Sequence, residues 1–397
     1  MTGYAALSEL AEINPSMPAA VQGSGLDRLV PFLPMSAVSE QGSASYEQRR
    51  PISELLQGYT YFERGDVLLA KITPCLENGK AAYLGDLPDH LGFGSTEFHV
   101  LRPRPGVDPR YLFHAVWSTA FRRAGVASFT GSAGQKRLPA SFFDRYKVPF
   151  PPLAEQRRIA AVLDKADGIR SKQRESLWLL DEFLRSAFLE MFGDPVRNEK
   201  EWDSKRLGDL AVIRRGASPR PIQQFLGGTI PWIKIGDATR SGGLFIERTA
   251  ERVTEAGAAR SVRLELGSIV VANSGVSLGF ARILAVAGCI HDGWLSVEHL
   301  PDSVNKMYFI CFINLMTQRL RRSAPTGTQP NLNVGILADL RVPMPPIQAQ
   351  GRFDELVASY IGLSARLRAA AAAAEQLFDS IAQRVFGEPM RALREVH

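Results

Sequence analysis

The sequence predicts an α+β protein that is built twice, as two similar globular domains that are each followed by one long α-helix. Three observations lead to this prediction: an internal repeat, Gly- and Pro-rich stretches that contain short β-type runs, and two long segments with a heptad pattern. The predicted parts are a first domain at 1–152, a first helix segment at 153–197, a second domain at 198–346, and a second helix segment with the C-terminal tail at 347–397.

The repeat consists of short strings that recur in the same order along the chain. Examples are Leu7–Ile13 with Leu207–Ile213, Phe62–Lys71 with Leu264–Asn273, and Phe192–Pro195 with Phe386–Pro389. Each match is weak by itself, but their constant order and nearly constant offset indicate a duplication. Within the domains, buried-type runs such as Asp66–Ala70 and Ser268–Ala272 are bounded by turn residues, as expected of strands. Tyr111–Arg123 and Tyr308–Arg322 are predicted as one helix in each domain.

Composition excludes several classes of protein. A chain of 397 residues that is 45% hydrophobic and 22% charged is typical of a globular protein with two or three domains. Cys75, Cys289 and Cys311 lie far apart, which argues against a disulfide framework or a zinc module. There is no apolar run of membrane-spanning length and no signal-peptide pattern at Met1, so we expect a cytoplasmic protein. The net charge of +6 favours a polyanionic partner without proving one.

The segments after the Pro-Pro pairs at 151–152 and 345–346 have the a/d spacing of a coiled coil. Each segment is long enough for a helix of about 58 Å, which needs a partner along its apolar stripe. The expected seam residues are Ile159, Leu163, Leu177, Leu180, Leu184 and Met191 in the first helix, and Phe353, Leu356, Tyr360, Leu363, Leu367, Leu377 and Ile381 in the second.

The heptads alone do not fix the direction of pairing. A duplicated unit that closes on itself by pseudo-two-fold symmetry sets the two helices antiparallel, with one domain near each end, as in a dumbbell. The alternative is two separate amphipathic helices that lie on the globular domains, and their length argues against it.

This organisation resembles the specificity (S) subunit of type I restriction-modification enzymes, over the whole chain. The motifs that carry the resemblance are Pro151–Ile159 at the start of the first helix, Phe192–Pro195 at its end, and the domain segments Lys71–Lys80, Ile230–Ile233 and Gly327–Asn333. The start of the second helix, Pro346–Gln350, departs from the family pattern with Gln where Glu is usual.

The resemblance implies that each globular domain is a target-recognition domain that reads one half of a split site in double-stranded DNA. It further implies that the helices set the spacing and bind two methyltransferase (modification) subunits, and that restriction subunits can join. No cofactor is expected on this chain; by resemblance, S-adenosylmethionine belongs to the modification subunit, and ATP and Mg to the restriction subunit.

The residues themselves also indicate DNA contact. Base readout needs Arg, Lys and short polar side chains on loops that can enter a groove, and Asn or Gln suits bidentate contact with adenine. The candidate DNA-binding residues of the first domain are Lys71, Thr73, Asn78, Lys80, Ser132, Gln135, Lys136 and Arg137. Those of the second domain are Lys234, Asn273, Ser274, Ser277, Thr328, Gln329, Asn331 and Asn333.

Other interpretations of these residues stay open. Asn, Ser, Thr and Gly most often form turns and cap their own backbone, so any one candidate has a structural alternative. Arg319, Arg321 and Arg322 can neutralise phosphates or simply solvate a helix face. His291 and Asp292 can be an acid/base pair, but a strand–turn junction with Trp294 in the core is favoured.

Catalytic classes have little support. The sequence has no phosphate-binding loop of the G-x-x-x-x-G-K-S/T type, no G-x-G-x-x-G and no Asn-Pro-Pro-Tyr/Phe motif. Its six His residues form no helical pair with a neighbouring Glu, so no metal site is expected. We therefore expect a non-catalytic specificity subunit. The alternatives are a protein–protein scaffold with duplicated peptide-binding domains, or the specificity subunit of a modification-only system.

Overall fold

The structure is a computed structural model that describes residues 3–23, 25–132, 135–323 and 331–387. The chain forms two compact units, Met1–Gln173 with Ala371–His397 and Arg174–Ala370. Each unit therefore contains one globular domain together with one half of each long helix. The predicted boundaries between domains and helix segments remain a prediction, since the compact units cut across both helices.

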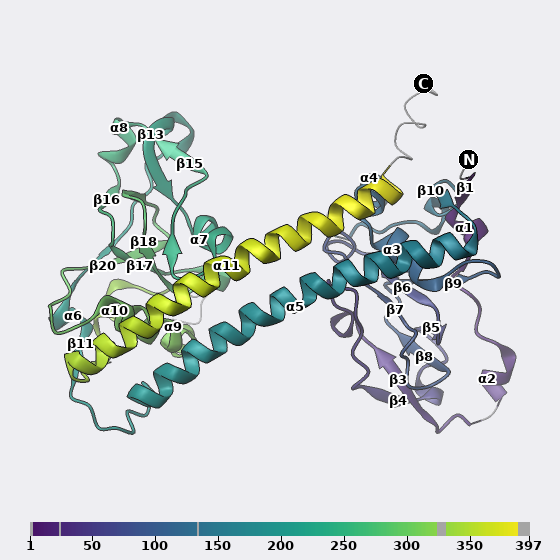
Figure 1. Cartoon of the computed structure of the whole chain (residues 1–397), viewed down its shortest axis with the longest axis horizontal. Coiled ribbons are helices and arrows are strands. Elements are labelled where there is room, and N and C mark those ends of the chain that lie inside the picture. The colour runs from purple at the N-terminus through teal and green to yellow at the C-terminus, as the bar shows by residue number, and fades with distance from the viewer. Residues whose placement is uncertain (1–2, 24, 133–134, 324–330, 388–397) are drawn as a thin grey trace. The chain divides into compact units, whose positions relative to one another are not determined.

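Among the described residues, the globular part of the first unit contains three small sheets and four α-helices. Figure 1 labels these strands and helices. All neighbouring strands are antiparallel except β3 and β8, which are parallel. The sheets are β1(Gly3–Ala6)-β10(Lys147–Phe150), β2(Ala11–Ile13)-β9(Phe98–Pro103)-β6(Val67–Ala70)-β7(Ala81–Tyr83), and β4(Arg49–Pro51)-β3(Leu29–Leu33)-β8(Leu91–Gly94)-β5(Thr60–Glu63). The helices are α1(Leu7–Leu10), α2(Ala19–Gly23), α3(Pro109–Trp117) and α4(Thr119–Ala127).

The globular part of the second unit repeats this plan. Its sheets are β11(Ser204–Arg206)-β21(Arg341–Pro343), β12(Val212–Arg215)-β20(Trp294–Glu298)-β17(Ile269–Ala272)-β18(Ala281–Leu284)-β14(Phe245–Ile246), and β15(Glu251–Val253)-β13(Leu226–Ile233)-β19(Gly288–Ile290)-β16(Val262–Leu264). Its helices are α6(Leu207–Leu210), α7(Ile235–Ser241), α8(Glu255–Ala258), α9(Lys306–Ser323) and α10(Val334–Ala338).

The duplication is visible in the strand register. Val67 of β6 lies opposite Leu101 and Tyr83, and the matching Ile269 of β17 lies opposite Val297 and Ile283. Both central strands are buried at every residue, as their apolar sequences require. The α+β fold with two similar domains is confirmed.

One predicted helix is in fact two. The segment predicted as a single helix at Tyr111–Arg123 breaks at Ser118, whose backbone is extended. The Ser118 hydroxyl accepts a hydrogen bond from the backbone N–H of Phe121 (3.2 Å), so it caps α4 as a new helix. The counterpart in the second unit, α9, runs through Lys306–Ser323 without a break.

The two long helices are α5(Leu153–Phe192) and α11(Ile347–Phe386), each of 40 residues. Gly193 follows α5 with a φ of 80°, the left-handed conformation that ends helices, as its Gly-Asp-Pro sequence predicts. In the first unit Arg170 of α5 contacts Glu375 of α11, and in the second unit Asp181 contacts Tyr360. The later residue on α5 pairs with the earlier residue on α11, so the helices are antiparallel, as predicted.

The predicted seam residues differ in how deeply they are buried. Leu163, Leu184, Phe353 and Tyr360 are buried. The half-buried members are Ile159, Leu177, Leu180, Met191, Leu356, Leu367 and Ile381.

Leu363 and Leu377, however, are 47% and 49% exposed, although Leu377 still lines a pocket together with Ile159 of α5. The neighbouring Ser364 and Phe378 are buried instead. Phe378 is drawn inward because its ring lies 3.8 Å from the Arg170 guanidinium carbon and packs against Trp117.

Among the helices that the structure describes, none combines the length and the apolar character needed to cross a membrane.

Candidate nucleic-acid interface

Two segments predicted to bind DNA lie side by side in the first domain. The first follows β6 and begins at Lys71, and the second includes Thr130–Ser132 and Gln135–Arg137. The backbone N–H of Leu138 donates to the carbonyl of Lys71 (2.8 Å), and the N–H of Thr73 donates to the carbonyl of Lys136 (3.0 Å). Sequence positions about 65 residues apart thus form one surface.

The second domain has the same arrangement. The backbone N–H of Leu332 donates to the carbonyl of Asn273 (2.7 Å), and Ser274 pairs with Asn331. Lys71 and Asn273 occupy matching positions one residue after β6 and β17. The paired loops are therefore duplicated together with the fold that carries them.

The side chains of the first-domain candidates fall into two groups. Ser132, Gln135 and Lys136 are exposed at the loop surface. Most of the others form hydrogen bonds within the domain. Thr73 donates to Glu77, Asn78 donates to Glu40 (3.0 Å), and Lys80 donates to the carbonyl of Met35 (3.0 Å). Arg137 forms an ion pair with Glu97 through Nε (2.9 Å) and Nη2 (2.8 Å). Lys71 is half-buried.

The second-domain candidates need one correction. Asn273 is 1% exposed and its Nδ2 donates to the carbonyl of Asp292 (2.8 Å), so its side chain cannot reach a base. Asn333 is exposed and caps α10 by accepting from the N–H of Ile336 (2.9 Å), as its turn-forming alternative predicts.

The remaining second-domain candidates are accessible or ion-paired. Lys234 precedes α7 and pairs with Glu251. Ser274, Ser277 and Asn331 are half-buried. Thr328 and Gln329 lie outside the described residues.

Comparison with known proteins identifies this architecture. The family model described as "Type I restriction modification DNA specificity domain" matches residues 7–177 and 199–361. The chain belongs to this family.

Individual relatives match different shares of the chain. The type I restriction enzyme EcoAI specificity subunit of Escherichia coli is 40% identical over 158 residues, which is 39% of this chain and 26% of that protein. The chain thus matches about a quarter of the length of that relative. The MjaIX specificity subunit of Methanocaldococcus jannaschii is 25% identical over 321 residues, 75% of this chain and 71% of that protein.

A solved structure supports the fold. The crystal structure of the type I restriction-modification system S subunit from M. genitalium covers 97% of this chain and 96% of its own chain, with a TM-score of 0.55 at 13% identity.

The specificity domain holds the start of each long helix with a buried glutamine. Gln156 accepts from the N–H of Asp108 (2.9 Å) and donates to the carbonyls of Gly106 (3.2 Å) and Pro151 (2.9 Å). Gln350 makes the matching set with Asn305, Ser303 and Pro345. Gln350 thus stands in the place of Gln156. Ala349 then stands where the first helix has the family glutamate, Glu155. The second motif therefore departs from the family pattern by Ala in place of Glu, and not by Gln in place of Glu as expected from the sequence.

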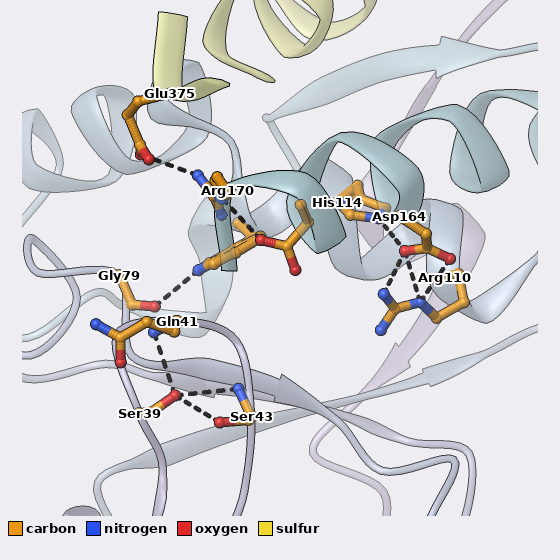
Figure 2. A network of polar contacts seen from close by, with 11 residues as sticks. Ser39, Gln41, Ser43, Gly79, Arg110, His114, Asp164, Arg170 and Glu375 are labelled. Atoms are coloured by element: carbon orange, nitrogen blue, oxygen red, sulfur yellow. Dashed lines mark hydrogen bonds and ion pairs between the residues drawn. The ribbon is translucent and has the colours of Figure 1, made fainter. Parts of the chain in front are cut away.

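A network of polar contacts joins the long helices to one candidate DNA-binding turn of the first specificity domain (Figure 2). Arg170 is buried between Trp117 and Phe378 and binds Asp167 (2.7 Å) and Glu375 (3.0 Å). The indole of Trp117 in turn donates to the carbonyl of Gly79 (2.9 Å), in the turn that carries Asn78 and Lys80. The helix pair therefore contributes to the position of a candidate recognition loop.

A second part of this network joins α3 to α5. Asp164 of α5 accepts hydrogen bonds from His114 (2.6 Å) and Arg110 (3.0 Å) of α3. Burial acts to raise the pKa of Asp164, but the hydrogen bonds from His114 and Arg110 outweigh it and lower the pKa to about 2. Asp164 is therefore ionised across the physiological range and fixes the orientation of the helix against the domain.

His99 is a buried residue that contacts the paired loops of the first domain. It is 4% exposed, its Nε2 bonds the carbonyl of Leu138 (2.8 Å), and its Nδ1 lies 3.1 Å from Asn14 Nδ2. Burial lowers the pKa of His99 from 6.5 to about 4. The neutral ring thus anchors the segment that follows Arg137.

We expect the first unit to lose stability in mild acid because of His99. Its folded-state pKa lies below its unfolded value, so the unfolded chain binds the proton first, and stability is lost as the pH falls from about 6.5 to about 4. The loss reaches about 3 kcal/mol at the lower limit. Urea titrations at several pH values measure it. A His99→Gln variant should show a smaller pH slope than the wild type, and His90→Gln, which alters an exposed ring, should keep the full slope. Equal slopes in all three proteins would contradict the assignment.

Proposed function

We propose that this chain is the DNA sequence-recognition subunit of a type I restriction-modification complex and is itself non-catalytic. Each specificity domain reads one half of a bipartite site in double-stranded DNA, and the antiparallel helices set the spacing between the halves. The observation that carries the proposal is the matched loop pair, in which Leu138 bonds Lys71 in one domain and Leu332 bonds Asn273 in the other. The same backbone frame, with different side chains, suits two readers of two different sequences.

The proposal also concerns partners and cofactors. Two methyltransferase subunits bind the helices and carry S-adenosylmethionine, and restriction subunits, where present, carry ATP and Mg. The supporting observation is a patch on α5 with two aromatic side chains and one leucine, which we call the aromatic patch. It consists of Trp178, Leu179 and Phe183, which are 61%, 53% and 54% exposed. At 100° per residue these three side chains project within an arc of about 140°, so they form one apolar strip.

The test is selection of methylated sites by the reconstituted complex from a pool of random DNA. We expect two short defined sequences separated by a spacer of fixed length. Binding should weaken steeply with salt, because a protein that neutralises several phosphates releases counterions. A single contiguous motif, or binding without sequence preference and without salt dependence, would overturn the proposal and favour a protein–protein scaffold. Cleavage by the complex would separate a restriction system from a modification-only one.

Replacing Trp178 and Phe183 by Ser should weaken binding of the methyltransferase subunit by about 30-fold or more. The reason is that one large aromatic anchor at the centre of an interface contributes about 2 kcal/mol or more, and the contributions of neighbouring anchors are not additive. Titration calorimetry measures the affinity. The control is Leu266→Ser, which removes another exposed apolar side chain (68% exposed) from a turn of the second domain. An unchanged affinity in the double variant would exclude the aromatic patch as the docking surface.

A further inference from the structure

The two specificity domains differ in one basic segment, which we call the arginine arm and define as residues 214–220. It contains Arg214, Arg215 and Arg220, and its first two residues are the last two residues of β12. Ile213 faces Val297 as Ile13 faces Leu101, so the matching segment of the first domain is 14–20, which contains no charged residue. The second domain correspondingly has 18 basic and 13 acidic residues at 198–345, whereas residues 1–150 have 15 and 14.

The backbone of the arginine arm is held tightly against the turn between β19 and β20. The N–H of Gly216 donates to the carbonyl of Trp294 (2.9 Å), and the carbonyl of Ala217 accepts from the hydroxyl of Ser261 (2.7 Å). A Cβ at Gly216 would lie 2.2 Å from the carbonyl oxygen of His291, so only glycine permits this approach. The arm is therefore a fixed part of the domain surface.

Asp292 links the arm to the recognition loops. Its carboxylate accepts from the hydroxyl of Ser218 (2.7 Å) and from Nη2 of Arg220 (3.3 Å). Its backbone carbonyl accepts from Nε of Arg215 (3.2 Å) and from the buried amide of Asn273 (2.8 Å). Burial acts to raise the pKa of Asp292, but the hydrogen bond from Ser218 and the nearby His291 and Arg220 outweigh it and lower the pKa. Asn273 is therefore buried because its side chain donates to the backbone of Asp292, although its position matches that of Lys71 in the first domain.

Arg220 has an exposed side chain that is oriented by one hydrogen bond. Its side chain is 81% exposed while one guanidinium N–H donates to Asp292. Arg220 also lines a cavity of about 840 Å³ together with Trp232, Lys234 and His291. The arm thereby meets Lys234, which the sequence independently marks as a candidate DNA contact.

We propose that Arg220 reads a guanine in the second half of the DNA site and that Asp292 is its positioning residue. This inference rests on the proposed function and assigns one base contact within it. Arg presents paired donors to O6 and N7 of guanine, which is the commonest specific contact in the major groove. The carboxylate beside it disfavours a phosphate, which is anionic, but not the uncharged edge of a base.

The experiment compares methylation of randomised DNA by complexes that contain the wild-type chain, Arg220→Ala, Arg220→Lys or Asp292→Asn. In the Ala variant, we expect the preference for guanine at one position of the second half-site to fall at least about tenfold. The first half-site should stay unchanged. Arg220→Lys keeps the charge and can still donate to guanine but loses the planar fork, so it should retain most of the overall affinity and lower the preference by less than Arg220→Ala does.

Asp292→Asn should weaken the same base preference while the melting temperature stays close to that of the wild type. Arg341→Ala is the charge-matched control, since Arg341 is exposed on the separate β11-β21 sheet, and it should leave the motif unchanged. A uniform loss of affinity over all sequences in Arg220→Ala, or an unchanged motif, would overturn the assignment. The absence of any bipartite motif in the wild-type complex would instead overturn the proposed function.

Discussion

Replacing Phe386 by Ala should destabilise the first unit by about 4 kcal/mol, although Phe386 belongs to the last turn of α11. Its side chain is fully buried and lies 5.4 Å from the ring of Tyr111 in α3. The matching residue at the end of α5, Phe192, packs on Tyr308 (4.9 Å) and Phe353 (5.4 Å) in the second unit. Each helix thus begins on its own domain and ends in the core of the other unit.

Hydrogen exchange resolved along the chain measures this effect, because it reports each unit separately. In Phe386→Ala, protection should fall in β6, β9 and α3, with little change in β17 and β20. Phe192→Ala should reverse the pattern. Phe183→Ala, which truncates an aromatic residue of α5 that is 54% exposed, should change neither. Loss of protection confined to the last turns of α11 would contradict the proposed role of Phe386.

The duplication and the helices could be predicted because both depend on spacing that the chain repeats. The heptad spacing of the apolar residues predicts the extent of the first helix, and Gly193 marks its end. The seam of α11 could not be predicted to the residue. At 363–364 the pattern favours Leu over Ser, yet Ser364 is buried. Phe378 is buried in place of Leu377 because it packs against Trp117 and Arg170, which lie outside α11.

The recognition loops show a second limit. Asn, Ser and Thr can cap helices, hydrogen-bond to the backbone of their own domain, or contact bases. Their occurrence at matched positions therefore predicts where the loops lie but not what each side chain does. Asn273 donates a hydrogen bond to the backbone of Asp292, and Asn333 caps α10. Gln135 and Lys136, by contrast, are exposed. The arginine arm was missed although its charge was visible, because the matching segment of the first domain carries none to compare it with.

Replacing Gln350 by Glu should lower the free energy of unfolding of the second unit by about 4 kcal/mol at neutral pH. The side chain is fully buried and joins three backbone groups, accepting from Asn305 (2.8 Å) and donating to the carbonyls of Ser303 (3.1 Å) and Pro345 (2.8 Å). Glutamate has the same shape, but its second oxygen would face two carbonyl oxygens where an NH₂ group now donates. The loss therefore comes from stranded acceptors and a buried charge, with no change in packing volume.

The same substitution should be less damaging at low pH. A buried carboxyl group has a raised pKa, so the folded variant takes up a proton that the unfolded chain releases, and its deficit relative to the wild type shrinks as the pH falls from about 7 to about 5. A protonated Glu can again donate one hydrogen bond. Urea titrations of variant and wild type at both pH values measure the difference. Gln348→Glu makes the same chemical change at an exposed site in the same helical turn, where a negative charge near the N-terminus of α11 is mildly stabilising. Equal effects at the two positions would mean that the buried hydrogen bonds of Gln350 do not hold the start of the helix.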